Sequence, residues 1–133
     1  MWFNKHGFRN SPLILVVDDD IQMINMIRSN LEAEGYRIEF ATDGLTGKQK
    51  AWELKPDLII ADIFMPGVDG LSMLDNIRKE PEMQKIPVIF LSGKAQENIK
   101  PEPNPLNRYA LLKKPVFLPE LNQLIHSFLK PPN

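Results

Sequence analysis

The sequence contains no cysteine among its 133 residues. This absence excludes a disulfide scaffold, a thiolate nucleophile and any metal site built on cysteine ligands. Long hydrophobic runs are also missing, because stretches such as Leu13–Val17 are far shorter than the roughly 20 residues that span a bilayer. The first eleven residues lack the apolar segment of a signal peptide. We therefore expect a soluble, cytoplasmic protein that does not enter a membrane.

An excess of charge of either sign is absent as well. The 16 basic and 17 acidic residues leave a net charge of −1, which argues against a chain built to coat nucleic acid or an anionic membrane. The length allows one domain with a core of its own. We expect this domain to cover residues 12–130, with short tails at 1–11 and 131–133.

Short apolar runs alternate with amphipathic segments along the chain. The runs that predict buried strands lie at 13–17, 36–41, 58–61, 86–91 and 109–112. Helices are predicted at 21–34, 45–54, 70–77 and from about 118 to 128, with Asp20 and Asp69 as N-caps and Gly35 beyond a C-terminus. Met23 and Met26 widen the apolar stripe of the first helix. This alternation predicts an α/β domain with a parallel sheet.

Proline, in contrast, is abundant, and seven of the 12 prolines lie at or beyond Pro101. A strict alternation would place a helix after the fourth strand, but Pro101, Pro103 and Pro105 forbid a helix beyond about Lys100. We therefore expect a shortened fourth helix followed by an extended loop within residues 94–107.

Polar residues follow four of the predicted strands. Asp18 and Asp19, Asp62, Ser92 and Lys114 should meet at one edge of a parallel sheet, where ligands bind in such folds. Three carboxylates in one place repel each other unless a cation lies between them, and an oxygen-rich open site suits Mg²⁺. The lysine offers a charge for phosphate, and aspartate can accept a phosphoryl group covalently. The edge therefore suits a phosphoryl group on or near a carboxylate.

Four motifs at this edge resemble those of the response-regulator receiver family. They are Val-Val-Asp-Asp-Asp (16–20), the segment from Pro56 to Gly70, Ile-Pro-Val-Ile-Phe-Leu-Ser-Gly (86–93) and Lys-Lys-Pro-Val-Phe (113–117). Intervals of 43, 30 and 22 positions separate Asp19, Asp62, Ser92 and Lys114, as in the family. The resemblance implies a flavodoxin-like, doubly wound sheet of five parallel strands in the order 2-1-3-4-5.

The resemblance also implies a role for each residue at this edge. Asp62 would accept phosphoryl from a phosphohistidine, and Ser92 would bond a phosphoryl oxygen. Lys114 would pair with Asp62 or its phosphate, next to a cis bond to Pro115. Asp18, Asp19 and Asp62 would hold Mg²⁺ with the backbone carbonyl of Phe64.

A protein of this family acts as a signalling switch and not as a turnover enzyme. The resemblance implies Mg²⁺-dependent self-phosphorylation from a donor and slow self-dephosphorylation. A histidine kinase or phosphotransfer protein would be the donor. Because the receiver-like segment uses nearly every residue, the response is expected to act through a protein partner on the face from strand four to helix five. A homodimer is possible, and direct nucleic-acid binding is not expected.

Three positions depart from the family pattern. The family has Tyr or Phe three residues before the lysine, whereas this chain has Leu111 there, with Tyr109 displaced by two. The fourth helix is cut short by proline. Phe64 is bulky and apolar at the position that borders the path of the hydrolytic water. We expect an atypical output face and a long-lived phosphorylated form.

Other interpretations of the same residues stay open. Asp18–Asp20 could be only an N-cap cluster, and the segment also contains the D-x-D of aspartate-based phosphatases. Such enzymes prefer Thr or Val where this chain has Gln22, and the chain has no room for their cap. A phosphorylation-independent interaction module is the third alternative. Leu111 and the proline-rich loop leave it open, and the intact residues Asp18, Asp19, Asp62, Ser92 and Lys114 count against it.

Overall fold

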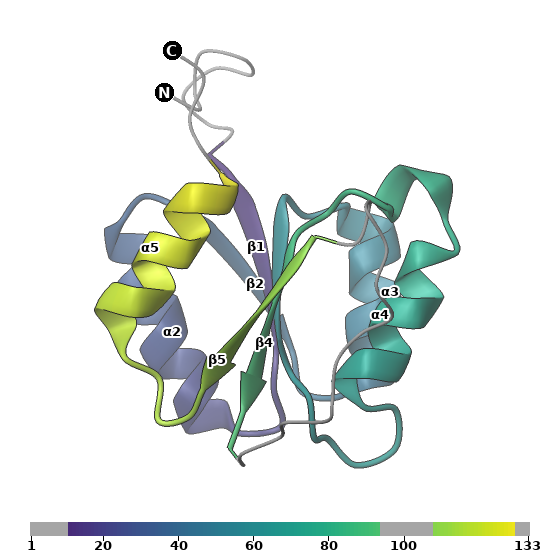
Figure 1. The fold of residues 1–133 in the computed structure, drawn as a ribbon, viewed down its shortest axis with the longest axis horizontal. Coiled ribbons are helices and arrows are strands. Elements are labelled where there is room, and N and C mark those ends of the chain that lie inside the picture. The colour runs from purple at the N-terminus through teal and green to yellow at the C-terminus, as the bar shows by residue number, and fades with distance from the viewer. Residues whose placement is uncertain (1–10, 94–107, 130–133) are drawn as a thin grey trace.

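A central parallel sheet with helices on both faces forms the protein in a computed structural model, which describes residues 11–93 and 108–129 (Figure 1). The strands are β1 (Leu13–Val17), β2 (Arg37–Ala41), β3 (Leu58–Asp62), β4 (Val88–Ser92) and β5 (Tyr109–Lys113). The helices are α2 (Ile21–Ala33), α3 (Gly44–Leu54), α4 (Gly70–Arg78), the short 3₁₀ helix η1 (Pro81–Met83) and α5 (Leu118–Phe128). All five strands run parallel in the order β2-β1-β3-β4-β5, which confirms the predicted order 2-1-3-4-5.

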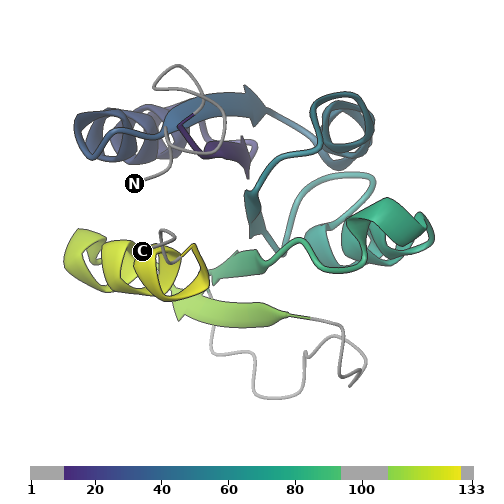
Figure 2. The ribbon, with the colours of Figure 1, turned by 90° about the horizontal axis from the view of Figure 1, so that it is seen from above.

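The sheet separates two apolar cores. Helices α2 and α5 cover one face, and α3 and α4 cover the other (Figure 2). Alternate residues of one strand point to opposite faces, so Ile14 and Val16 join the α2 and α5 core while Leu15 and Val17 join the other. All five residues of β1 are buried, as are those of β3 and β4. Each large apolar side chain removed from water in this way stabilises the fold by roughly 1.5–3 kcal/mol.

The caps predicted for the helices are present. The carboxylate of Asp20 accepts hydrogen bonds from the backbone N–H groups of Gln22 and Met23, and that of Asp69 accepts one from Ser72. Gly35 has φ +97°, the left-handed conformation that favours glycine after a helix. These caps fix where α2 and α4 begin, directly after the loops that follow β1 and β3.

Some expectations were wrong in detail. Met26 was expected to widen the buried stripe of α2, but its side chain is 38% exposed. The helix buries only Ile24, Ile27 and Leu31, and Met26 lies outside this stripe. The fourth strand begins at Val88, after Pro87, and the helix η1 was not predicted. The short helix and extended loop predicted within 94–107 lie outside the described residues, as do most of the predicted tails. No helix in the described ranges is long and apolar enough to cross a membrane.

Candidate functional site

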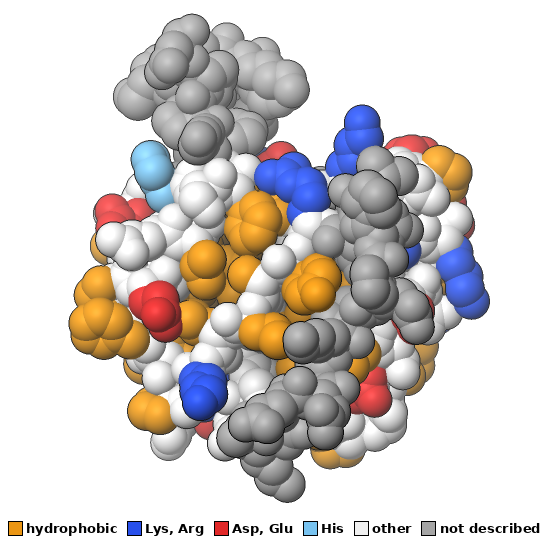
Figure 3. Space-filling model, viewed as in Figure 1, with side chains coloured by type: hydrophobic (Ala, Val, Ile, Leu, Met, Phe, Trp, Pro, Cys, Tyr) orange, Lys and Arg blue, Asp and Glu red, His pale blue; other side chains and the backbone are white. Residues whose placement is uncertain are grey.

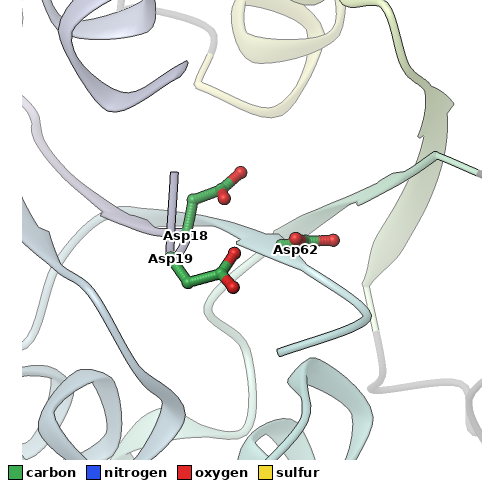
Figure 4. A group of neighbouring side chains, drawn as sticks. All are labelled: Asp18, Asp19 and Asp62. Atoms are coloured by element: carbon green, nitrogen blue, oxygen red, sulfur yellow. The ribbon is translucent and has the colours of Figure 1, made fainter. Parts of the chain in front are cut away.

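Three carboxylates meet at the carboxyl edge of the sheet. Asp18 and Asp19 follow β1, and Asp62 is the last residue of β3, the neighbouring strand. Their side chains lie at one place, with one carboxylate oxygen from each within 4.8 Å of the others (Figure 4). Asp18 is fully buried and Asp62 is 6% exposed, whereas Asp19 is exposed. The sequence argument that parallel strands bring these residues together is thus matched by the geometry.

Lys114 lies between the two buried carboxylates. Its Nζ is 3.2 Å from Asp18 Oδ2 and 3.3 Å from Asp62 Oδ2. Burial alone would lower the pKa of Lys114, but the charges of Asp18 and Asp62 outweigh burial and raise the pKa. Lys114 therefore stays protonated and provides a fixed positive charge beside Asp62. The neighbouring Lys113 is exposed.

Backbone N–H groups orient the same carboxylates. The N–H of Asp20 donates to Asp18 Oδ1 at 2.9 Å, and the N–H of Phe64 donates to Asp62 Oδ1 at 3.2 Å. The second oxygen of each carboxylate is the one that faces Lys114. Both carboxylates are thus held in one orientation before any ligand arrives.

Asp18 is the fully buried carboxylate of the site. Burial raises the pKa of its carboxyl, against the opposing effects of the Asp20 N–H and the Lys114 charge. Its Oδ2 is buried and accepts no hydrogen bond among the described residues, although Lys114 lies within ion-pair distance. A buried oxygen of this kind, next to two further carboxylates, is the donor set that a hard divalent cation such as Mg²⁺ prefers. The residues present therefore fit that ion.

Ser92 lies at the carboxyl end of β4, between the strands that carry Asp62 and Lys114. Leu91 is the register partner of Asp62, and Lys113 is the partner of Ser92. The Ser92 carbonyl accepts a hydrogen bond from the Lys114 N–H at 2.7 Å, and the residue is 6% exposed. The bond from Lys114 to Pro115 is cis. All predicted polar residues therefore gather at one edge.

Gly70 is a residue of this site that the sequence argument did not single out. A Cβ atom on Gly70 would lie 2.4 Å from the backbone oxygen of Asp62, and the Gly70 N–H donates to the Ile63 carbonyl at 2.9 Å. Only a residue without Cβ allows α4 to begin this close to the end of β3. Gly70 is the last residue of the segment from Pro56 to Gly70 that resembles the family, but its contact with the Asp62 backbone can be seen only in the folded structure.

We expect Gly70→Ala to destabilise the protein by roughly 1–3 kcal/mol, the usual cost of overpacking. Urea unfolding measures this change. Gly93→Ala is the matched control, because among the described residues the nearest atom to its new Cβ is 3.9 Å away, on Lys114. Equal unfolding free energies for the two variants would contradict the tight contact at Gly70.

The aromatic residue of β5 is Tyr109, the first residue of the strand, which is a different place from the one that the family uses. Tyr109 packs against Phe90, with ring centroids 6.5 Å apart, and joins the core on the α3 and α4 side. Leu111, which stands at the family's aromatic position, is 40% exposed. Apolar side chains gather over the β5 edge of the molecule (Figure 3). The surface over β5 therefore carries the aliphatic side chain of Leu111 at the position where the family has Tyr or Phe.

Comparisons with known proteins agree with this geometry. Residues 14–126 match the family model of the response regulator receiver domain. The chain is 33% identical over 121 residues to the DNA-binding dual master transcriptional regulator RpaA of Synechocystis, covering 90% of this chain and 49% of that protein. It is 30% identical over 119 residues to the phosphate regulon transcriptional regulatory protein PhoB of Rhizobium meliloti, covering 90% and 52%. The chain thus spans about half the length of these curated relatives.

Solved structures give the same result. The chemotaxis protein CheY4 of Vibrio cholerae superposes with a TM-score of 0.82 at 27% identity, covering 90% of this chain and 100% of that chain. The receiver domain of the Francisella response regulator 1452 superposes with a TM-score of 0.79 at 30% identity, covering 90% and 98%.

Proposed function

Because the chain belongs to the response-regulator receiver family, whose members are switches of two-component signalling, we propose that Asp62 is its phosphoacceptor. The observation that supports this most strongly is the position of Asp62, which ends β3 within ion-pair distance of Lys114 and beside two further carboxylates. Its Oδ1 accepts a hydrogen bond from the Phe64 N–H and its Oδ2 faces Lys114. Asp18 has the same kind of contacts but is fully buried, whereas Asp62 keeps 6% of its surface exposed and can be reached by a donor.

The proposed reaction is a phosphoryl transfer between side chains. A carboxylate oxygen of Asp62 attacks the phosphorus of a phosphohistidine, a P–O bond forms, the P–N bond breaks, and the imidazole leaves and takes up a proton. Lys114 then pairs with a phosphoryl oxygen in place of Asp62, and the hydroxyl of Ser92 donates to another. A small acyl phosphate can serve as donor by the same route. Hydrolysis of the aspartyl phosphate returns the protein slowly to its initial state.

We propose that Asp18, Asp19 and Asp62 hold Mg²⁺, together with the backbone carbonyl of Phe64. The carboxylate cluster and the buried Oδ2 of Asp18 support this assignment. When bound, Mg²⁺ supplies the positive charge that reduces repulsion between these carboxylates and the incoming phosphoryl oxygens.

Intact mass spectrometry after incubation with Mg²⁺ and acetyl phosphate tests the proposal. We expect one phosphoryl group per chain, which disappears when EDTA removes the metal. Continuous release of phosphate from simple phosphate esters would instead indicate an aspartate-based phosphatase. No adduct at all would favour an interaction module that keeps the fold without the chemistry.

Phe64 is proposed to protect the phosphorylated state. It is 43% exposed and lies two residues after Asp62, at the position that borders the path of the hydrolytic water in the family. Replacing it by asparagine would open this approach and provide a group that can hydrogen-bond a water. We expect Phe64→Asn to shorten the lifetime of the aspartyl phosphate several-fold, measured by loss of the adduct after donor removal. An unchanged lifetime would contradict the protective role.

We propose that a histidine kinase or phosphotransfer protein docks beside the site, in the cytoplasm where ATP supplies such donors. Phe117, the residue before α5, is 66% exposed, and Ile21 at the start of α2 is 48% exposed. Both lie just past the loops that carry Lys114 and Asp18–Asp20, and exposed apolar side chains of this kind suit a protein partner. The downstream partner, or a second copy of the chain, is proposed to use the face from β4 to α5, which carries Leu111.

Phe117→Ser separates docking from chemistry. Serine is a good N-cap and Phe117 makes no side-chain cap to α5, so the helix should keep its stability. We expect phosphotransfer from a protein donor to slow at least tenfold, while phosphorylation by acetyl phosphate stays unchanged. If both rates stay at the wild-type value, Phe117 is not part of the donor interface.

A further inference from the structure

An open cleft lies at the opposite end of the molecule from the carboxylates. It has a volume of about 530 Å³ and is lined by Glu34 and Tyr36, which follow α2, and by residues of α5. The α5 residues of the lining are Asn122, Gln123, His126 and Ser127. Because both helices run antiparallel to the strands, their last turns meet at the amino edge of the sheet. The cleft is therefore separate from the phosphorylation site.

The base of the cleft is apolar and well supported. Tyr36 is partly buried and packs against the core between the sheet, α2 and α5. The two helices are held together beside the cleft by a pair of amides, in which Asn30 Nδ2 donates to Asn122 Oδ1 at 2.7 Å. Asn122 Nδ2 in turn donates to Glu34 Oε1 at 3.5 Å. The cleft thus has the ring of Tyr36 at its base and one carboxylate, that of Glu34, in a lining that also includes His126.

The N-terminal residues of the chain join the described part right beside this cleft. The N–H of Arg37, the neighbour of Tyr36, donates to the Pro12 carbonyl at 2.9 Å, and Arg37 Nε donates to the Ser11 carbonyl at 2.9 Å. Ser11, the first described residue, therefore lies next to the residue that follows Tyr36 of the cleft lining. Three residues extended back from Ser11 reach roughly 10 Å, and nine reach about 30 Å.

The composition of residues 1–10 matches the cleft. The segment holds three aromatic residues, Trp2, Phe3 and Phe8, and two basic residues, Lys5 and Arg9, with no acidic one. Aromatic side chains suit an apolar base, and the basic residues suit the carboxylate of Glu34. We propose that residues 1–10 dock in this cleft and connect the ends of α2 and α5.

Disulfide trapping tests the proposal in a chain that has no native cysteine. The variant Phe8→Cys/Gln123→Cys pairs the segment with the cleft, and Phe8→Cys/Leu54→Cys is the matched control on the other face of the sheet. Leu54 is 38% exposed at the end of α3. It lies three residues before Asp57, whose carboxylate accepts a hydrogen bond from Leu13 N–H at 2.8 Å, so the segment also starts near it.

Under mild oxidation we expect the cleft pair to form an intramolecular disulfide at least fivefold faster than the control pair. Adding Glu34→Lys should slow this reaction. Equal rates for the two pairs would overturn the proposal, and so would disulfides that form only between two copies of the chain.

The fluorescence of Trp2 provides a second readout that needs no cysteine. Trp52→Phe leaves Trp2 as the single tryptophan. We expect acrylamide to quench Trp2 more weakly in the folded protein than in a peptide of residues 1–10. Equal quenching would contradict docking.

Discussion

Replacing Asp62 by asparagine is expected to abolish phosphorylation, with at least a hundredfold loss of adduct formed from acetyl phosphate. The amide has nearly the shape of the carboxylate but lacks the nucleophilic oxygen that would attack phosphorus. It also removes one of the two carboxylates that face Lys114 at 3.3 Å or less. Intact mass spectrometry with Mg²⁺ present measures the fraction of chains that carry a phosphoryl group.

The control for this variant is Asp75→Asn, at an exposed position on α4 far along the helix from its N-cap. It changes the net charge by the same amount and should become phosphorylated as the wild type does. A stoichiometric adduct on the Asp62→Asn protein would show that another residue is the acceptor.

Replacing Asp18 by asparagine is expected to have two opposite effects. Without Mg²⁺ the variant should be more stable than the wild type. The reason is that burial raises the pKa of Asp18, so the charged carboxylate costs stability at neutral pH. This cost falls as the pH is lowered through the raised pKa in the folded state, and asparagine removes it at every pH.

With Mg²⁺ the order should reverse. A ligand at a hundredfold excess over its Kd stabilises a fold by about 2.7 kcal/mol. We expect the wild type to gain such stability and Asp18→Asn to gain almost none, because the amide is a weaker ligand without charge. Thermal unfolding with and without Mg²⁺ measures both effects.

Asp19→Asn is the matched comparison, since Asp19 is exposed and lies in the same cluster. It should weaken the response to Mg²⁺ while leaving stability without the ion nearly unchanged. A full Mg²⁺ response in Asp18→Asn would contradict the proposed ligand set.

The strands were predictable from sequence because the sheet is buried on both faces. A parallel strand under helices reads as a continuous apolar run, and β1, β3 and β4 are such runs. The place of the candidate site follows from the same argument, since the residues directly after parallel strands share one edge. The strand order came from the resemblance, because periodicity says nothing about which strands are neighbours.

Features that depend on contacts between distant parts of the chain were not predictable. The exposure of Met26 depends on how narrow the buried stripe of α2 is, which is decided by the sheet beneath it. The need for Gly70 depends on the position of the Asp62 backbone oxygen. The place of Tyr109 depends on Phe90, a residue of the neighbouring strand. In each case the sequence contains both residues but does not show that they are in contact.

The chemical nature of the modified residue is the central claim, and borohydride reduction tests it most directly. The protein is phosphorylated with acetyl phosphate and Mg²⁺, reduced at once, digested and sequenced by mass spectrometry. Borohydride converts an aspartyl phosphate to homoserine and leaves unmodified aspartate intact. We predict homoserine at position 62, dependent on Mg²⁺ and absent from the Asp62→Asn protein. Intact aspartate at position 62, or homoserine at position 18 or 19 instead, would contradict the account.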